Sequence, residues 1–147
     1  MKRLVVFLLV LILFAAEGNA QADQNKPRTE FNVTFGWAGN DFGIFKSLGY
    51  HLIRGFVSAE VSLAIIEGQY PLSGNLTLQV PLYKFVPYVT GGYGYSLAGT
   101  GVTNMGAGLK IRLSPSMGIL AEYRQFAYNS FGKKKSTLIG AGFAYLF

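Results

Sequence analysis

The chain has 147 residues, no cysteine and a formal net charge of +6. The lack of cysteine excludes disulfide scaffolds, thiolate metal sites and cysteine nucleophiles, and the length leaves room for one domain. The positive charges are scattered, apart from one short lysine run, and do not form the grouped basic patch that would predict a nucleic-acid partner.

The N-terminus has the three parts of a secretory signal. Two basic residues precede an apolar run over residues 4–16, and small residues follow it. The run is shorter than the roughly 20 residues that a helix needs to cross a bilayer. We therefore expect a signal peptide over residues 1–22, cleaved after residue 20 or 22, and export through the secretory pathway. Residues 23–29 are polar and aperiodic, and are expected to form a flexible lead-in.

From residue 30 onward the hydrophobic pattern has a period of two, which is typical of β-strands. Aromatic or branched side chains alternate with small or polar ones, and clusters of Gly, Pro, Asn and Ser separate the alternating segments. This pattern predicts an all-β domain of eight strands. They are expected over residues 30–37, 42–52, 57–65, 75–82, 88–96, 102–113, 117–124 and 136–147.

The last of these segments has two very different faces. Ile139, Phe143 and Phe147 share one bulky, partly aromatic face, while the opposite face is mostly small and includes Gly140 and Gly142. A bulky face suits contact with lipid, and a slim face suits a crowded barrel interior. No apolar run after the signal is long enough for a membrane helix, so a mature chain in a membrane would span it as a closed barrel.

The C-terminus resembles the signal that the outer-membrane barrel assembly machinery recognises, in which aromatic residues stand at the end and two and four positions before it, near a glycine. Four residues carry this match: Gly140, Phe143, Tyr145 and Phe147. Residues 86–95 and 121–126 also resemble segments of outer-membrane protein A-type barrel domains. The resemblance implies an eight-stranded antiparallel up-and-down transmembrane β-barrel over residues 30–147, in the outer membrane of a Gram-negative bacterium, with that machinery as a partner.

An even number of strands in an up-and-down barrel returns both chain termini to the same rim. The long connections at 66–73, 97–101 and 129–135 are then expected on one rim, and the turns at 53–55, 83–86 and 114–116 on the other. The first connection, at 38–41, is short although it belongs to the long-loop rim.

Parity directs six charged side chains to the small-residue face. This expected lumen charge network consists of Glu30, Glu60, Lys110, Arg112, Glu122 and Arg124. The interior of an eight-stranded barrel is only wide enough for side chains, so these charges must pair with one another or with trapped water. We expect a largely closed lumen; an ion path or gate formed by Glu122, Arg124 and Lys110 is the alternative.

His51 is the only histidine, so a Ser-His-acid hydrolase would have to use it. It is expected at the surface near a short turn, on the rim opposite the long loops, with no serine beside it on a neighbouring strand. One histidine and no cysteine also predict no metal or cofactor site. Lys133, Lys134 and Lys135 lie in a long loop expected to face outside. They are expected to form a solvated charge run, with binding of anionic lipid headgroups, such as those of lipopolysaccharide, as the alternative.

Three functions remain consistent with the sequence. The favoured one is a small, non-enzymatic outer-membrane barrel with a structural or surface-interaction role. The alternatives are an outer-membrane lipid A-modifying enzyme and a soluble lipocalin-like ligand carrier. A lipocalin would turn its apolar face inward and its charges outward, and parity alone does not say which face is inside.

Overall fold

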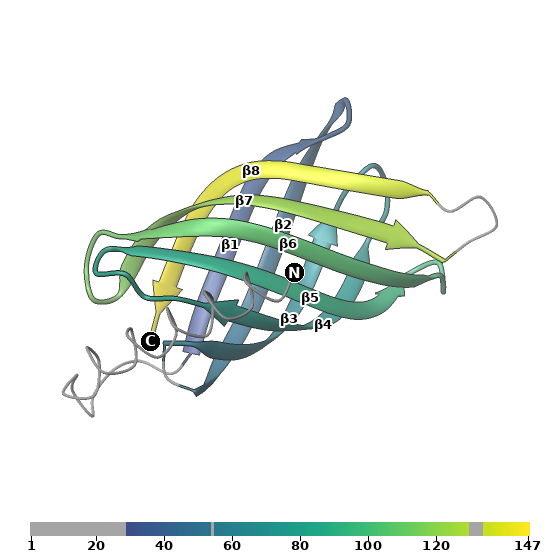
Figure 1. Cartoon of the computed structure of the whole chain (residues 1–147). Helices are drawn as coiled ribbons and strands as arrows, with labels where there is room; N and C mark the ends of the chain where they lie inside the picture. The colour runs from purple at the N-terminus through teal and green to yellow at the C-terminus, as the bar shows by residue number, and fades with distance from the viewer. Residues whose placement is uncertain (1–28, 54, 130–133) are drawn as a thin grey trace, which may run out of the picture.

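A computed structural model describes residues 29–53, 55–129 and 134–147; the expected signal peptide and nearly all of the lead-in lie outside the described residues. Eight strands close into one barrel in sequence order, with every neighbouring pair antiparallel (Figure 1). The predicted eight-stranded antiparallel barrel is thus confirmed. The strands are β1 (Thr29–Ala38), β2 (Asp41–Ile53), β3 (Val57–Ile65), β4 (Pro71–Gln79), β5 (Phe85–Ser96), β6 (Gly101–Arg112), β7 (Met117–Tyr128) and β8 (Lys135–Leu146).

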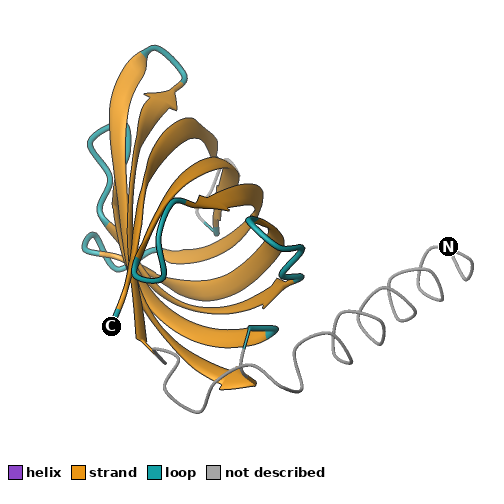
Figure 2. Ribbon diagram, turned by 90° about the vertical axis from the view of Figure 1, so that its left-hand side faces the viewer, coloured by secondary structure: helices purple, strands orange, loops and turns teal. Residues whose placement is uncertain are grey.

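The seam between β1 and β8 closes the barrel. Their register runs from the pair Glu30–Leu146 to the pair Ala38–Leu138. Beyond it, Thr29 and Phe147 exchange backbone hydrogen bonds of 3.1 and 2.9 Å. This closure leaves no sheet edge for pairing with another chain. Figure 2 shows the strands curving around a common axis, with the loops and turns at their ends.

The limits of three strands differ from the sequence prediction by three or more residues. β7 runs on to Tyr128, past the predicted end at residue 124. β4 begins at Pro71, and the predicted strand had begun at residue 75. Proline fits the first position of a strand because a missing N–H there weakens the ladder least. At the other end the alternating pattern runs on to Leu82, but the chain has already turned: Tyr83 has a φ of 56° and Leu82 bridges to Phe85. β5 therefore starts at Phe85, earlier than predicted.

The two faces of the barrel have opposite chemistry. Large apolar side chains cover the outside on every strand, for example Phe35, Leu48, Leu76 and Phe143, while most buried side chains with polar groups point inward. This arrangement is the reverse of a soluble carrier, which needs an apolar interior and a polar surface. Small residues on the inner face permit close strand packing: a Cβ added at Gly142 would lie 1.7 Å from the carbonyl oxygen of Val33.

The interior is not polar along its whole length. At the rim opposite the termini, buried apolar side chains from several strands meet in a cluster that we call the apolar plug. Its members are Ala38, Phe45, Ala64, Ile66, Val102, Phe126, Tyr128 and Leu138. The rings of Phe45 and Phe126 lie 6.4 Å apart at its centre. The plug fills the lumen at the rim that carries the longer loops.

Candidate functional site: the polar lumen and the loop rim

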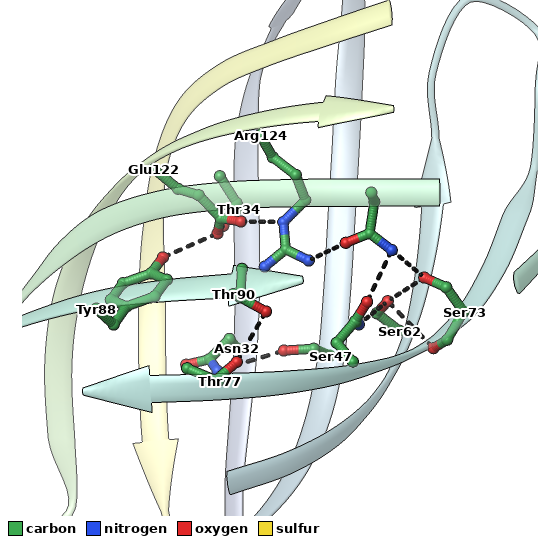
Figure 3. Close-up of polar contacts among 12 residues, drawn as sticks. Asn32, Thr34, Ser47, Ser62, Ser73, Thr77, Tyr88, Thr90, Glu122 and Arg124 are labelled. Atoms are coloured by element: carbon green, nitrogen blue, oxygen red, sulfur yellow. Dashed lines mark hydrogen bonds and ion pairs between the residues drawn. The ribbon is translucent and has the colours of Figure 1, made fainter. Parts of the chain in front are cut away.

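The central layer of the lumen is organised around the carboxylate of Glu122 (Figure 3). Arg124, two residues along β7, donates from Nε to Oε1 of Glu122. Thr34 on β1 donates to Oε2 at 3.2 Å, and Tyr88 on β5 donates to the same oxygen at 3.1 Å. Glu122 is 5% exposed and Arg124 is 1% exposed. A buried ion pair of this kind is favourable only when further hydrogen bonds satisfy both partners, and here they surround the carboxylate.

The hydrogen bonds continue from Arg124 across the barrel. Its Nη1 donates to Oδ1 of Asn104 on β6 at 3.2 Å. Asn104 donates in turn to Ser73 at 3.0 Å and to Asn75 at 2.7 Å, both on β4. Asn75 then donates to Ser62 on β3 at 2.7 Å. We call this chain, together with Glu122, Thr34 and Tyr88, the central polar layer. It links strands on opposite sides of the barrel and occupies the lumen just below the apolar plug.

A second group, the lower polar cluster, lies toward the rim that carries the termini. Lys110 on β6 donates to Oε1 of Glu30 and, at 3.3 Å, to Oε1 of Gln79. Nε2 of His51 lies 3.6 Å from Oε2 of Glu30. Nδ1 of the same histidine lies 3.3 Å from Nε2 of Gln79. Lys110 also lies 4.9 Å from the ring centroid of Tyr88, so it contacts the central layer through a cation–π interaction.

Four of the six predicted lumen charges are brought together as two ion pairs, Glu30 with Lys110 and Glu122 with Arg124. The other two stand apart. Glu60 is buried and accepts a hydrogen bond from Ser58 at 3.4 Å, without a cation among the described residues. Arg112 is half-exposed at the end of β6 and forms no ion pair within the described ranges.

His51 departs from its expected surface position, because it is 6% exposed and faces the lumen. The expectation that no serine would lie beside it was also wrong: Ser58 on β3 is its register partner and is buried on the same face. The register between β2 and β3 shifts between His51 and Ile53. His51 shares the parity of Phe45, Ser47 and Gly49, so the alternation along β2 could have placed it inward, and its nearness to a turn was the misleading signal. Ser58 donates to Glu60, and the ring nitrogens of His51 face Gln79 and Glu30.

Glu67, which sequence reasoning did not single out, joins two loops at the opposite rim. Its carboxylate accepts a hydrogen bond from Ser136 at 2.7 Å and lies 3.3 Å from Nζ of Lys134. The Ser136 hydrogen bond, followed by Lys134, holds the pKa of Glu67 below its usual range. Lys134, one of the three lysines expected to form a solvated charge run, therefore contacts a carboxylate of the protein itself. Lys135 is exposed at the start of β8, and Lys133 lies outside the described residues.

The described residues offer neither a metal centre nor a membrane-spanning helix. In those ranges, no group of three or more His, Asp or Glu side chains is arranged to hold a metal ion. Within the same part of the chain, no helix is long and apolar enough to span a membrane.

No protein-family model and no curated protein matches this chain. Solved structures do match its fold. A de novo designed transmembrane β-barrel superposes with a TM-score of 0.64 at 20% identity, covering 85% of this chain and 99% of that one. The N-terminal β-barrel domain of Pseudomonas aeruginosa OprF gives 0.64 at 18% identity, covering 81% and 96%. The outer membrane enzyme PagL gives 0.50 at 11% identity, covering 80% and 99%.

These similarities confirm, at the level of fold, the resemblance to small eight-stranded outer-membrane barrels that the sequence had predicted. At such low identity the likeness concerns the fold alone, and one of these neighbours is an enzyme.

Proposed function

We propose that this chain is a small outer-membrane β-barrel with a side-chain-filled, closed lumen, serving a structural or surface-interaction role in a Gram-negative envelope. The observation that carries the proposal is the inversion of the two faces. Apolar and aromatic side chains cover the outside, while charged and hydrogen-bonded side chains fill the inside. A water-soluble barrel with this outer surface would expose apolar area far beyond the few hundred Å² that soluble monomers tolerate.

Closure of the lumen is supported by two consecutive obstructions. The central polar layer spans the interior with ion pairs and hydrogen bonds, and the apolar plug follows it toward the loop rim. Water and ions could cross the lumen only by separating the side chains of both the central polar layer and the apolar plug. A steady conductance like that of a 16-stranded porin is therefore not expected.

The proposal includes export through the secretory pathway, supported by the signal pattern over residues 1–22. It also includes insertion by the barrel assembly machinery, supported by the pattern of Gly140, Phe143, Tyr145 and Phe147. Lipopolysaccharide is a proposed partner at the loop rim. Lys135 is exposed there, and Lys134 keeps more than half of its side chain exposed although it contacts Glu67.

The test is expression of the full chain in a Gram-negative host, followed by fractionation, gel migration with and without heating, and recordings in planar bilayers. We expect the protein in the outer-membrane fraction, a heat-dependent shift in migration, and only rare, small openings. A monomer that is soluble without detergent would contradict the membrane assignment. Large, stable currents would contradict the closed lumen.

A lipid A-modifying enzyme is the second candidate, supported by the register pairing of His51 with Ser58 and by the likeness to PagL. It is less well supported, because Ser58 donates to Glu60 and both residues are buried in the lumen. Nucleophilic catalysis needs the serine within hydrogen-bond reach of its base and accessible to substrate. Lipid A hydrolysis by the purified protein that is lost in His51→Ala would promote this candidate.

A further inference from the structure

Lys46 on β2 is the one charged side chain of the described strands that faces outward away from a strand end. The charged residues Asp41 and Lys135, also exposed, are the first residues of β2 and β8. Lys46 forms no ion pair within the described part of the chain. Under the proposed function, on which this inference rests, Lys46 therefore faces the hydrocarbon region of the membrane.

Two aromatic residues place Lys46 near the middle of the apolar band. On the same outward face of β2, Phe42 lies four residues before Lys46 and Tyr50 four residues after it, and both rings are exposed. Aromatic residues of outer-membrane barrels gather at the two membrane interfaces. Four residues of a tilted strand cover roughly 10 Å of an apolar band about 25 Å tall. Lysine side chains reach the interface from near the ends of a membrane span, and Lys46 lies near its middle.

Apolar side chains surround this lysine. Val33 on β1 and Leu63 on β3 are its register partners, and Ile44 and Leu48 stand on either side of it on the outward face of β2. We call these five residues the Lys46 face. A cation in this setting is destabilising unless an anion meets it, because the hydrocarbon region supplies neither water nor a counter-charge. The face therefore combines an apolar surface with a single charge that lacks its complement.

We propose that the Lys46 face binds a second, different membrane protein that presents a carboxylate at mid-bilayer depth. The carboxylate pairs with Lys46, and apolar side chains of that protein pack against Val33, Leu48 and Leu63. Charge complementarity carries the proposal, because an ion pair removes the cost of an isolated cation in lipid.

Two other occupants fit this face less well. The phosphate of an anionic lipid lies at the level of the rim, about half the apolar band away from Lys46. A second copy of the chain offers no carboxylate at the right depth, because no Asp or Glu of the described strands faces outward between the strand ends. A two-fold contact through this face would also set Lys46 against Lys46, where the charges repel.

A synthetic membrane helix provides the first test. The purified protein, labelled with a fluorescent donor, is reconstituted in phosphatidylcholine vesicles with an acceptor-labelled, leucine-rich helix that carries either Asp or Asn at its centre. Energy transfer measures the association. We expect the Asp helix to associate roughly fivefold more tightly than the Asn helix, the gain of one polar contact inside a bilayer. Lys46→Leu should abolish this difference, and Lys135→Leu, at the aqueous rim, should keep it.

Photocrosslinking in the cells that naturally produce the chain tests for the partner itself. The photoreactive amino acid benzoylphenylalanine is placed at Leu48, beside Lys46, or at Met105 on β6, four strands away around the barrel, as the control. We expect one discrete protein adduct from Leu48 and none from Met105, and loss of the adduct in Lys46→Leu. Mass spectrometry locates the carboxylate of the captured protein. Lys46→Glu, combined with lysine at that carboxylate position, should restore the adduct.

Equal association of the Asp and Asn helices, or a Leu48 adduct that persists in Lys46→Leu, would overturn the proposal while leaving a folded membrane barrel intact. The absence of a protein adduct at Leu48, or an adduct made of two copies of this chain, would overturn it as well. Heat-dependent gel migration checks that every variant has folded. Failure of the proposed function has a different signature, because the protein would then remain soluble and monomeric without detergent.

Discussion

The guanidinium carbon of Arg124 lies 3.8 Å from the centroid of the Phe45 ring. Arg124 thus contacts both halves of the lumen: its Nε is bonded to Glu122 in the central polar layer, and its planar face covers an aromatic residue of the apolar plug. A desolvated cation–π contact contributes about 2 kcal/mol or more. The ion pair and the apolar plug are therefore expected to stabilise one another.

Glu122→Ala should leave Arg124 buried without its carboxylate partner. Loss of one member of a buried ion pair is strongly destabilising, so the free energy of unfolding should fall by about 3 kcal/mol. Urea unfolding in lipid vesicles, followed by gel migration, measures this change. The double variant Glu122→Ala with Arg124→Ala should recover part of the loss. Glu60→Ala should have a smaller effect, since Glu60 forms no ion pair in the described ranges. An unchanged urea midpoint for Glu122→Ala would show that the ion pair of the central polar layer does not stabilise the barrel.

Phe126→Ala should open the apolar plug, because Phe126 is fully buried against Phe45. Removing a buried ring destabilises by about 3 to 5 kcal/mol. The cavity also removes the second obstruction above the central polar layer, so planar-bilayer recordings should show more frequent openings than the original protein. Phe143→Ala is the matched control, because Phe143 faces outward. Identical conductance of the two variants would show that the plug does not limit flow.

Lys46 faces outward near the middle of β2, in register with Val33 on β1 and Leu63 on β3. A lysine facing lipid near the bilayer midplane is destabilising by about 2 to 4 kcal/mol. Lys46→Leu should therefore raise the free energy of unfolding in vesicles by about 2 kcal/mol. The same change at Lys135, at the start of β8, should have little effect because it lies near the aqueous rim. A destabilised Lys46→Leu variant would mean that Lys46 has a favourable partner in the bilayer.

Glu67→Gln tests the contact between the loops by its pH dependence. Because the pKa of Glu67 is lowered by Ser136 and then by Lys134, its ionised form is favoured in the folded protein. Its contribution is present above the ordinary glutamate pKa and is lost as the pH falls through the lowered, folded-state value. Amide hydrogen exchange at Ser136 should accelerate at acidic pH in the original protein. In Glu67→Gln, exchange at Ser136 relative to an unstructured reference peptide should not change with pH. Ser136→Ala should raise the pKa of Glu67 measured by NMR; an unmoved pKa would contradict the assigned cause.

Period-two alternation predicted the eight strands and their inner and outer faces, because a barrel strand must present one face to the lumen and one to the outside. It placed Glu122 and Arg124 inward and Phe143 outward, as the structure has them. Alternation does not report where a chain turns, so the limits of β4 and β5 were missed around Tyr83, where backbone geometry ends the strand.

The candidate site was less predictable, because it depends on register between strands that are distant in sequence. The pairing of His51 with Ser58 follows from the β2–β3 register, and Glu67 meets Ser136 only because β8 closes on β1. Parity also treats all inward residues alike. It therefore gave no sign that the inner face becomes apolar at one rim, where Phe45 and Phe126 meet.

Phe147 joins the seam of the barrel through its backbone and belongs to the proposed assembly signal. Its backbone exchanges two hydrogen bonds with Thr29, whereas its side chain is exposed and lies 5.9 Å, centroid to centroid, from the ring of Tyr145. Deleting Phe147 removes both contributions and should lower the folded, membrane-inserted fraction in cells and also in purified vesicles.

Phe147→Ala separates the two contributions, because it keeps the backbone hydrogen bonds with Thr29 and removes only the ring. If the assembly machinery recognises the aromatic side chain, this variant should insert poorly in cells yet refold in purified vesicles nearly as well as the original protein. Phe147→Tyr, which keeps an aromatic ring, should insert normally in both. Equal insertion of Phe147→Ala and the original protein in cells would restrict the role of the last residue to closing the seam, where an unpaired strand edge would otherwise remain.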